Sequence, residues 1–160
     1  MKRSAVLFAV LVCAALAPAQ QEYSGPRPPK PDLPYLMHAD NLVATEAGEA
    51  REEQRKNEST YTISGAASPA RTPLAEPIFL LLSDKIAPES LELYRLEVKG
   101  GNRQVVLAKK KKDSRPLRLM VTRLAEKLYR IEVNEGMGLE NGEYSLTPSG
   151  SNQVFCFEVY

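Results

Sequence analysis

His38 is the one imidazole in the chain, and it stands two residues before Asp40. A strand would place both side chains on one face, where they could share a metal ion or form part of a Ser-His-Asp hydrolytic triad. Such a triad would use Asp40 or Asp84 and one of many serines, and the chain has no G-x-S-x-G elbow. The spacing marks out no third metal ligand. We therefore interpret His38 as a structural or surface residue.

The two cysteines also invite a chemical role. Cys13 lies within an apolar run, after Val10-Leu11-Val12, where lipidation would require a small residue, so we expect no lipoprotein. Cys156 stands between Phe155 and Phe157 with no cationic residue nearby in the sequence, and we interpret it as a buried apolar side chain. One His and two Cys cannot supply the four ligands of a zinc site built only from these residue types.

A basic cluster consists of Lys109–Lys112 and Arg115, with Asp113 as the only opposing charge. It could bind phosphate, anionic lipid headgroups or an acidic polysaccharide. A solvated connection that protects neighbouring strand edges explains it equally well. If the cluster binds anions, binding to an acidic matrix should weaken with salt and disappear when the four lysines become alanine. No aromatic residues are interleaved, so we expect no nucleic-acid partner.

Other catalytic patterns are weak. Carboxylates are plentiful, but no pair stands out for sugar hydrolysis. Gly136-Met137-Gly138 lacks the Lys-Ser/Thr of a phosphate loop. The sequence therefore predicts no catalytic, cofactor-binding or metal-binding residues, and it predicts that the protein is not an enzyme.

Length and composition limit the elements that must position these residues. The chain has 160 residues, a mass of 17.7 kDa, 43% hydrophobic residues and a formal net charge of +1. This length predicts one domain, and the hydrophobic content suffices for a packed core. A charge so near zero does not indicate a nucleic-acid-binding protein.

The first 19 residues have the pattern of a secretory signal peptide. Lys2 and Arg3 precede 12 apolar residues from Ala5 to Leu16. Ala17 and Ala19 then supply the small residues that a signal peptidase accepts just before the bond it cleaves. Twelve residues are too few for a transmembrane helix. Cleavage after Ala19 would leave Cys156 as the only cysteine, so no internal disulfide is expected. The sequence predicts a secreted or periplasmic protein without a transmembrane segment in the mature chain.

Two polar segments follow the predicted cleavage site. Residues 20–34 contain five prolines and predict a disordered or polyproline II linker. A proline-rich docking motif is the alternative, and a tether is the favoured interpretation. Residues 45–60 are rich in Glu, and Thr45 could cap a short helix with Arg55 and Lys56 at its end. This segment has no apolar face, which indicates a solvated excursion. Asn57-Glu58-Ser59 matches the N-glycosylation triplet, which matters only in a eukaryote.

Short β-prone runs dominate the remaining chain. A short strand or a strand pair is expected at 35–43, a strand at 61–63, and irregular structure at 66–77 because of its three prolines. The continuous apolar run 78–82 predicts a strand covered on both faces. Alternation in 91–99, the turn signal Gly100-Gly101-Asn102 and the run 104–108 predict a hairpin. A final strand is expected at 154–160, with Phe155, Phe157 and Val159 on one face.

Residues 116–133 allow two interpretations. Ser114 with Pro116 could start a helix. The residues at helical spacing would be Leu117, Val121, Leu124, Leu128 and Ile131. The alternative is a hairpin with Ala125-Glu126-Lys127 as its turn. Its β-branched residues favour the hairpin.

Residues 139–144 read L-x-x-G-x-Y, from Leu139 through Gly142 to Tyr144. This segment resembles the tyrosine corner of immunoglobulin-like and fibronectin-type β-sandwiches, in which a Tyr near the start of the penultimate strand bonds to upstream backbone. The resemblance covers six residues. It implies a folding device and carries no activity.

These patterns together predict an all-β fold after the signal peptide (1–19) and the linker (20–34). The fold expected for residues 35–160 is an antiparallel, immunoglobulin-like β-sandwich of about eight short strands. The predicted function is an exported, non-catalytic module with a binding or structural role in the cell envelope or extracellular space. Its partner would be an unknown protein or an anionic surface. The alternatives are a secreted hydrolase that uses His38 or carboxylates, and an anion-binding module that uses the 109–115 loop.

Overall fold

The structure is a computed structural model that describes residues 22–108 and 115–160. Its regular elements are almost all strands, and the described residues contain no α-helix. In chain order the strands are β1 (Tyr35–His38), β2 (Asn41–Ala44), β3 (Glu46–Glu49), β4 (Arg51–Arg55), β5 (Glu58–Ser64), β6 (Arg71–Thr72), β7 (Ile78–Leu82), β8 (Leu91–Lys99), β9 (Asn102–Ala108), β10 (Leu119–Ala125), β11 (Leu128–Val133), β12 (Gly142–Pro148) and β13 (Gln153–Val159). One 3₁₀ turn, η1 (Pro88–Ser90), precedes β8. The predicted all-β class is confirmed, although the strands outnumber the eight expected.

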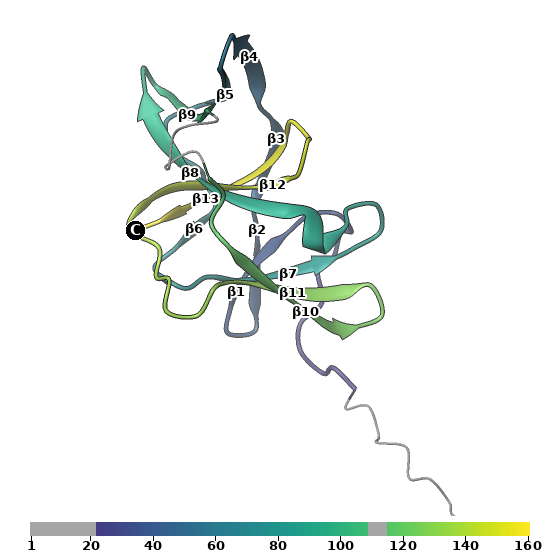
Figure 1. The fold of residues 1–160 in the computed structure, drawn as a ribbon. Coiled ribbons are helices and arrows are strands. Elements are labelled where there is room, and N and C mark those ends of the chain that lie inside the picture. Colours follow the sequence, from purple (N-terminus) through teal and green to yellow (C-terminus); the bar gives the residue numbers. More distant parts are fainter. Residues whose placement is uncertain (1–21, 109–114) are drawn as a thin grey trace, which may run out of the picture.

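The strands form two sheets (Figure 1). The smaller sheet has the order β10-β11-β7-β1-β2, and all its pairs are antiparallel. Its central strand β7 carries Phe79, Leu80 and Leu81, which are fully buried. A strand with buried side chains on both faces needs an unbroken apolar run, as the sequence of β7 predicts.

The larger sheet curls into a half-barrel. Its order is β3-β13-β12-β8-β9-β5-β4, and the short β6 adds a parallel pair to β13. Only Ala50 separates β3, which pairs with β13, from β4, which pairs with β5 at the opposite end of the order. One chain segment therefore holds both ends of the sheet, which bends it around a concave face.

Two apolar clusters stabilise this arrangement. The main core lies between the sheets, where the Phe79 ring meets the Phe157 ring edge-on at 5.0 Å, and Phe157 stacks on Tyr144 at 5.6 Å. The second cluster lies on the concave face of the larger sheet. It consists of Ala50, Ile63, Leu96, Val154 and Cys156, with Tyr61 and Val105 packed against it. Strands β12 and β13 thus bury side chains on both faces.

Most of the predicted hairpins are present. β8 and β9 turn at Gly100 and Gly101, both with positive φ, and β1 and β2 form the pair expected at 35–43. Residues 116–133 are confirmed as a hairpin, because β10 pairs with β11 in a register that sets Val121 opposite Ile131. Ile131 and Val133 belong to the main core, and Leu119 and Val121 pack against it.

The segment after Thr45 differs from the prediction. It forms β3, β4 and the start of β5, and the short helix suggested by Thr45 is wrong. Thr45 is buried and its hydroxyl donates to the Pro34 carbonyl at 2.7 Å, so it does not cap a helix. Acidic residues near the start of this segment and basic residues at its end match the charge preference of a helix dipole. The segment has no apolar stripe to stabilise a helix by packing, whereas strand pairing gives its backbone N–H and C=O groups hydrogen-bond partners. In the irregular segment 66–77, the two-residue strand β6 is the exception.

Residues 22–34 contain no helix or strand, and their last part is fixed to the domain. The Asp32 carboxylate accepts backbone hydrogen bonds from Asp84, Lys85 and Ile86 at 2.8–3.0 Å. Leu33 packs against the main core. Across the described parts of the chain, no helix has the length and apolar character needed to cross a bilayer.

Candidate functional site

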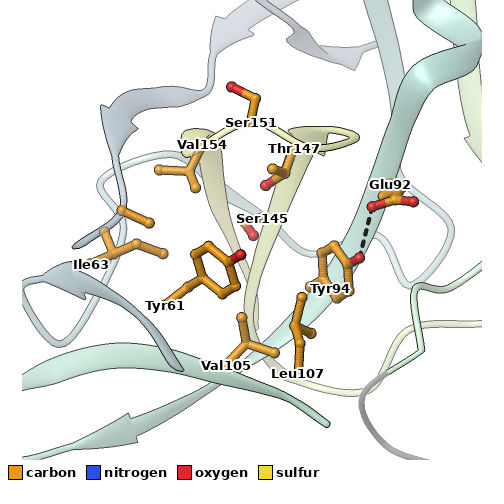
Figure 2. Close-up of a pocket in the computed structure, with 12 residues that line it drawn as sticks. Tyr61, Ile63, Glu92, Tyr94, Val105, Leu107, Ser145, Thr147, Ser151 and Val154 are labelled. Atoms are coloured by element: carbon orange, nitrogen blue, oxygen red, sulfur yellow. Dashed lines mark hydrogen bonds between the residues drawn. The ribbon is translucent and has the colours of Figure 1, made fainter. Parts of the chain in front are cut away.

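The concave face of the larger sheet contains a cavity, which we call the hollow (Figure 2). β8 and β9 pair only over the three residue pairs next to their turn, from Lys99–Asn102 to Glu97–Gln104. Beyond these pairs the two strands separate, and the hollow opens between them. The space within it that the centre of a water-sized sphere can occupy is about 70 Å³. The lining residues are Ala50, Tyr61, Ile63, Glu92, Tyr94, Val105, Leu107, Ser145, Thr147, Gly150, Ser151 and Val154.

Two tyrosine–glutamate pairs occupy the hollow and its rim. Tyr94 donates its hydroxyl hydrogen to Glu92 at 2.7 Å, and Tyr61 donates to Glu52 at 3.0 Å. Glu92 and Tyr94 are two residues apart on one face of β8, while Glu52 and Tyr61 are direct partners across β4 and β5. Burial, followed by the neighbouring carboxylate, raises the pKa of both tyrosines, so both phenols stay protonated as donors.

Hydroxyl and aliphatic side chains complete the lining. Ser145 and Thr147 on β12 lie opposite Tyr94 and Glu92 on β8. The remaining wall is apolar and comes mainly from Ile63, Val105, Leu107 and Val154 (Figure 2). An apolar cavity with a few polar groups at one side is typical of small-ligand sites.

An ionic cluster of Arg103, Glu46 and Glu143 lies on the same concave face, beyond Ile63. The side chain of Arg103 is only 1% exposed. Its guanidinium donates to both Glu46 oxygens at 2.6 and 2.9 Å and to the carbonyls of Ser64 and Gly65, both at 2.9 Å. Glu143 lies 3.6 Å from the guanidinium and accepts from the Ser68 amide. These bonds satisfy a charge that would otherwise be costly to bury.

The cluster affects the titration of its neighbours. Hydrogen bonds from Arg103 hold the pKa of Glu46 below its ordinary value, whereas burial raises the pKa of Glu143. Burial also raises the pKa of the Cys156 thiol to about 12, although the nearby Arg103 acts in the opposite direction. Cys156 is therefore a protonated, buried thiol at neutral pH, as its position between two phenylalanines predicts.

The residues that the sequence suggested for catalysis are not brought to the hollow. His38 lies on β1 in the smaller sheet, where its Nε2 is 3.0 Å from the Thr72 hydroxyl. Thr72 is buried. Within residues 22–108 and 115–160, no three His, Cys, Asp or Glu side chains are grouped to hold a metal ion. Lys109–Lys112 and Asp113 lie outside the described residues, and Arg115 is exposed.

Sequence reasoning missed the residues that do come together. Tyr61 with Ile63, and Tyr94 with Leu96, are aromatic–aliphatic pairs at strand spacing that signal an inward face. Arg103 has the same parity as the apolar Val105 and Leu107, and such a charge within an apolar row signals a buried ion pair.

The chain was also compared with known proteins. Comparisons with protein-family models, with curated proteins and with solved structures gave no match.

Proposed function

We propose that the chain is an exported, non-catalytic binding module and that the hollow is its ligand site. The observation that carries this proposal is the hollow itself, an apolar cavity lined by two tyrosines and Glu92, with Glu52 hydrogen-bonded to one of the tyrosines. The curl that forms it depends on the bent segment through Ala50, because this segment holds both ends of the sheet.

Export rests on the sequence of residues 1–19, which lie outside the described residues. The positive start, the apolar run and the small residues before Gln20 support a secretory signal peptide and a periplasmic or extracellular location. A role in the cell envelope or extracellular space follows from that location.

We propose the immunoglobulin-like class as the finer description of the fold. The Tyr144 hydroxyl donates to the Glu140 carbonyl at 2.8 Å, which is the hydrogen bond that a tyrosine corner makes. Gly142 has a φ of +154, at the point where the chain enters β12. These features support the class locally.

No observation on the described residues favours the hydrolase alternative. The His38 imidazole has Thr72 as its hydrogen-bond partner and does not line the hollow. The anion-binding alternative depends on the 109–115 loop, in which Lys109–Lys112 lie outside the described residues and Arg115 is exposed, and it stays a prediction.

A neutral probe tests the binding site. We expect n-pentanol to shift the backbone amide NMR signals of lining residues such as Val105 and Val154. The Ser151→Trp variant places a large ring at the rim and should abolish these shifts. Asn152→Trp is the matched control, since Asn152 is exposed and does not line the hollow. Equal shifts in both variants, or none in the unmodified protein, would contradict the proposal.

A further inference from the structure

We infer that the hollow binds an alkylammonium group, that is, a protonated amine on an apolar stem. This inference rests on the proposed binding function and adds the chemical class of the ligand. The group could belong to a free amine or to a lysine side chain of a polypeptide, since both present the same chemistry.

The polar atoms of the hollow are mainly hydrogen-bond acceptors. The two phenol hydrogens are already donated, one to Glu52 Oε1 and one to Glu92 Oε2. This arrangement leaves the second oxygen of Glu92 and the phenolic lone pairs as acceptors in the hollow. Glu52 lies outside the lining and also accepts from the Gln54 amide at 3.0 Å. The Ser151 hydroxyl accepts from the Gln153 amide and keeps its own hydrogen as a donor. A ligand that brings several hydrogens and no acceptor fits this set, and an ammonium has three donors.

The charge of the site points the same way. Glu92 is the only charged side chain among the described lining residues, and Glu52 adds a second negative charge beside Tyr61. The ionic cluster further along the concave face contains two carboxylates and one guanidinium. The described part of the concave face therefore favours a cation over an anion.

The rest of the lining suits the body of such a ligand. Tyr61 and Tyr94 line the cavity (Figure 2), and aromatic rings attract cations. Ile63, Val105 and Val154 form an apolar wall that would cover a short alkyl stem.

A sugar fits the same residues less well. Carbohydrate hydroxyls both donate and accept, so their sites need donors as well as acceptors. Among the described lining residues there is no Asn, Gln, Lys, Arg or His, and the hydroxyls of Ser145, Thr147 and Ser151 are the side-chain donors that remain for this purpose. The imbalance favours a ligand that donates only.

Three probes of equal length test the inference: n-pentylammonium, n-pentanol and pentanoate, each titrated into the isotope-labelled protein. We expect n-pentylammonium to bind at least about tenfold more tightly than n-pentanol, and pentanoate to bind most weakly. Glu92→Gln keeps an acceptor for Tyr94 but removes the charge. It should weaken n-pentylammonium binding by about tenfold and leave n-pentanol binding within about twofold. Glu97→Gln on the same strand is the control, since Glu97 is exposed and does not line the hollow.

The outcomes separate the two proposals. Equal or tighter binding of n-pentanol or pentanoate, or an unchanged n-pentylammonium affinity in Glu92→Gln, overturns the ammonium inference and leaves the binding site intact. If no probe shifts the lining amides, the proposed binding function fails as well. A lysine residue blocked at both backbone ends distinguishes the sources: binding as tight as that of n-pentylammonium assigns a polypeptide lysine, and much weaker binding assigns a free amine.

Discussion

At the scale of single residues, Arg103 is a buried charge that needs counter-ions. Its side chain is 1% exposed and is balanced by Glu46 at 2.6 Å and Glu143 at 3.6 Å. Removing one partner of a buried ion pair leaves an uncompensated buried charge. The stability lost in this way exceeds the net stability that the intact pair contributes.

Arg103→Met should therefore lower the free energy of unfolding by about 3–5 kcal/mol, because two carboxylates lose their counter-ion. Urea denaturation measures this change. Arg95→Met is the matched control, since the pair of Arg95 with Glu140 is exposed and should contribute about 0–1 kcal/mol. Similar losses in the two variants would show that the ionic cluster does not stabilise the fold.

Glu46 predicts a pH dependence. Hydrogen bonds from Arg103 lower its pKa from an ordinary value of 4.5. Its contribution to stability is therefore complete above that value and is lost as the pH falls through the lowered pKa. Glu46→Gln should reduce the free energy of unfolding by about 2 kcal/mol near neutral pH and by much less in strong acid. Denaturation of both proteins across this pH range checks it, with the exposed Glu49→Gln as control. A constant difference at all pH values would contradict the assignment.

At the scale of elements, the β8–β9 turn depends on two glycines. Gly100 and Gly101 have φ values of 58 and 76, in the left-handed region, and nothing lies within 4 Å of an added Cβ at either position. Any loss from a substitution there is therefore conformational and not steric.

Gly101→Ala should lower the free energy of unfolding by about 1 kcal/mol, because alanine is strained at positive φ. Gly48→Ala on β3 is the control. Its Cβ would meet Val154 at an ordinary 3.8 Å, so it should be neutral or gain up to about 1 kcal/mol through a less flexible unfolded chain. Thermal and urea unfolding compare the two variants. If Gly101→Ala is as stable as Gly48→Ala, the turn is not set by these glycines.

Sequence patterns predict the elements whose pairing is local and not those whose pairing is distant. The β10–β11 hairpin was predictable because its alternation and its turn at Ala125–Lys127 are local. β3 was not, because its partner β13 lies about a hundred residues away and its own residues are polar. The hollow needs this distant pairing, so Tyr61 and Tyr94 could be recognised as strand residues but not as neighbours around one cavity.

At the scale of the whole molecule, the proposed function has two parts, export and ligand binding. Residues 1–19 predict cleavage after Ala19, and the folded part presents a cavity on its concave face.

Expression of the full chain in a secreting bacterial host tests export. We expect the protein in the periplasm or medium, with mass spectrometry placing its first residue at Gln20. The reason is that small residues precede the Ala19–Gln20 bond. Leu11→Lys interrupts the apolar run and should leave the chain uncleaved. An exported chain that keeps residues 1–19, or cleavage unaffected by this substitution, would contradict the assignment.

The most direct measurement for the central claim is a crystal structure with pentylamine that carries bromine at its apolar end. We expect an anomalous bromine peak inside the hollow, against the wall of Ile63, Val105 and Val154, with the ammonium toward Glu92. A peak at another place on the surface, or a hollow filled only by water, would contradict it.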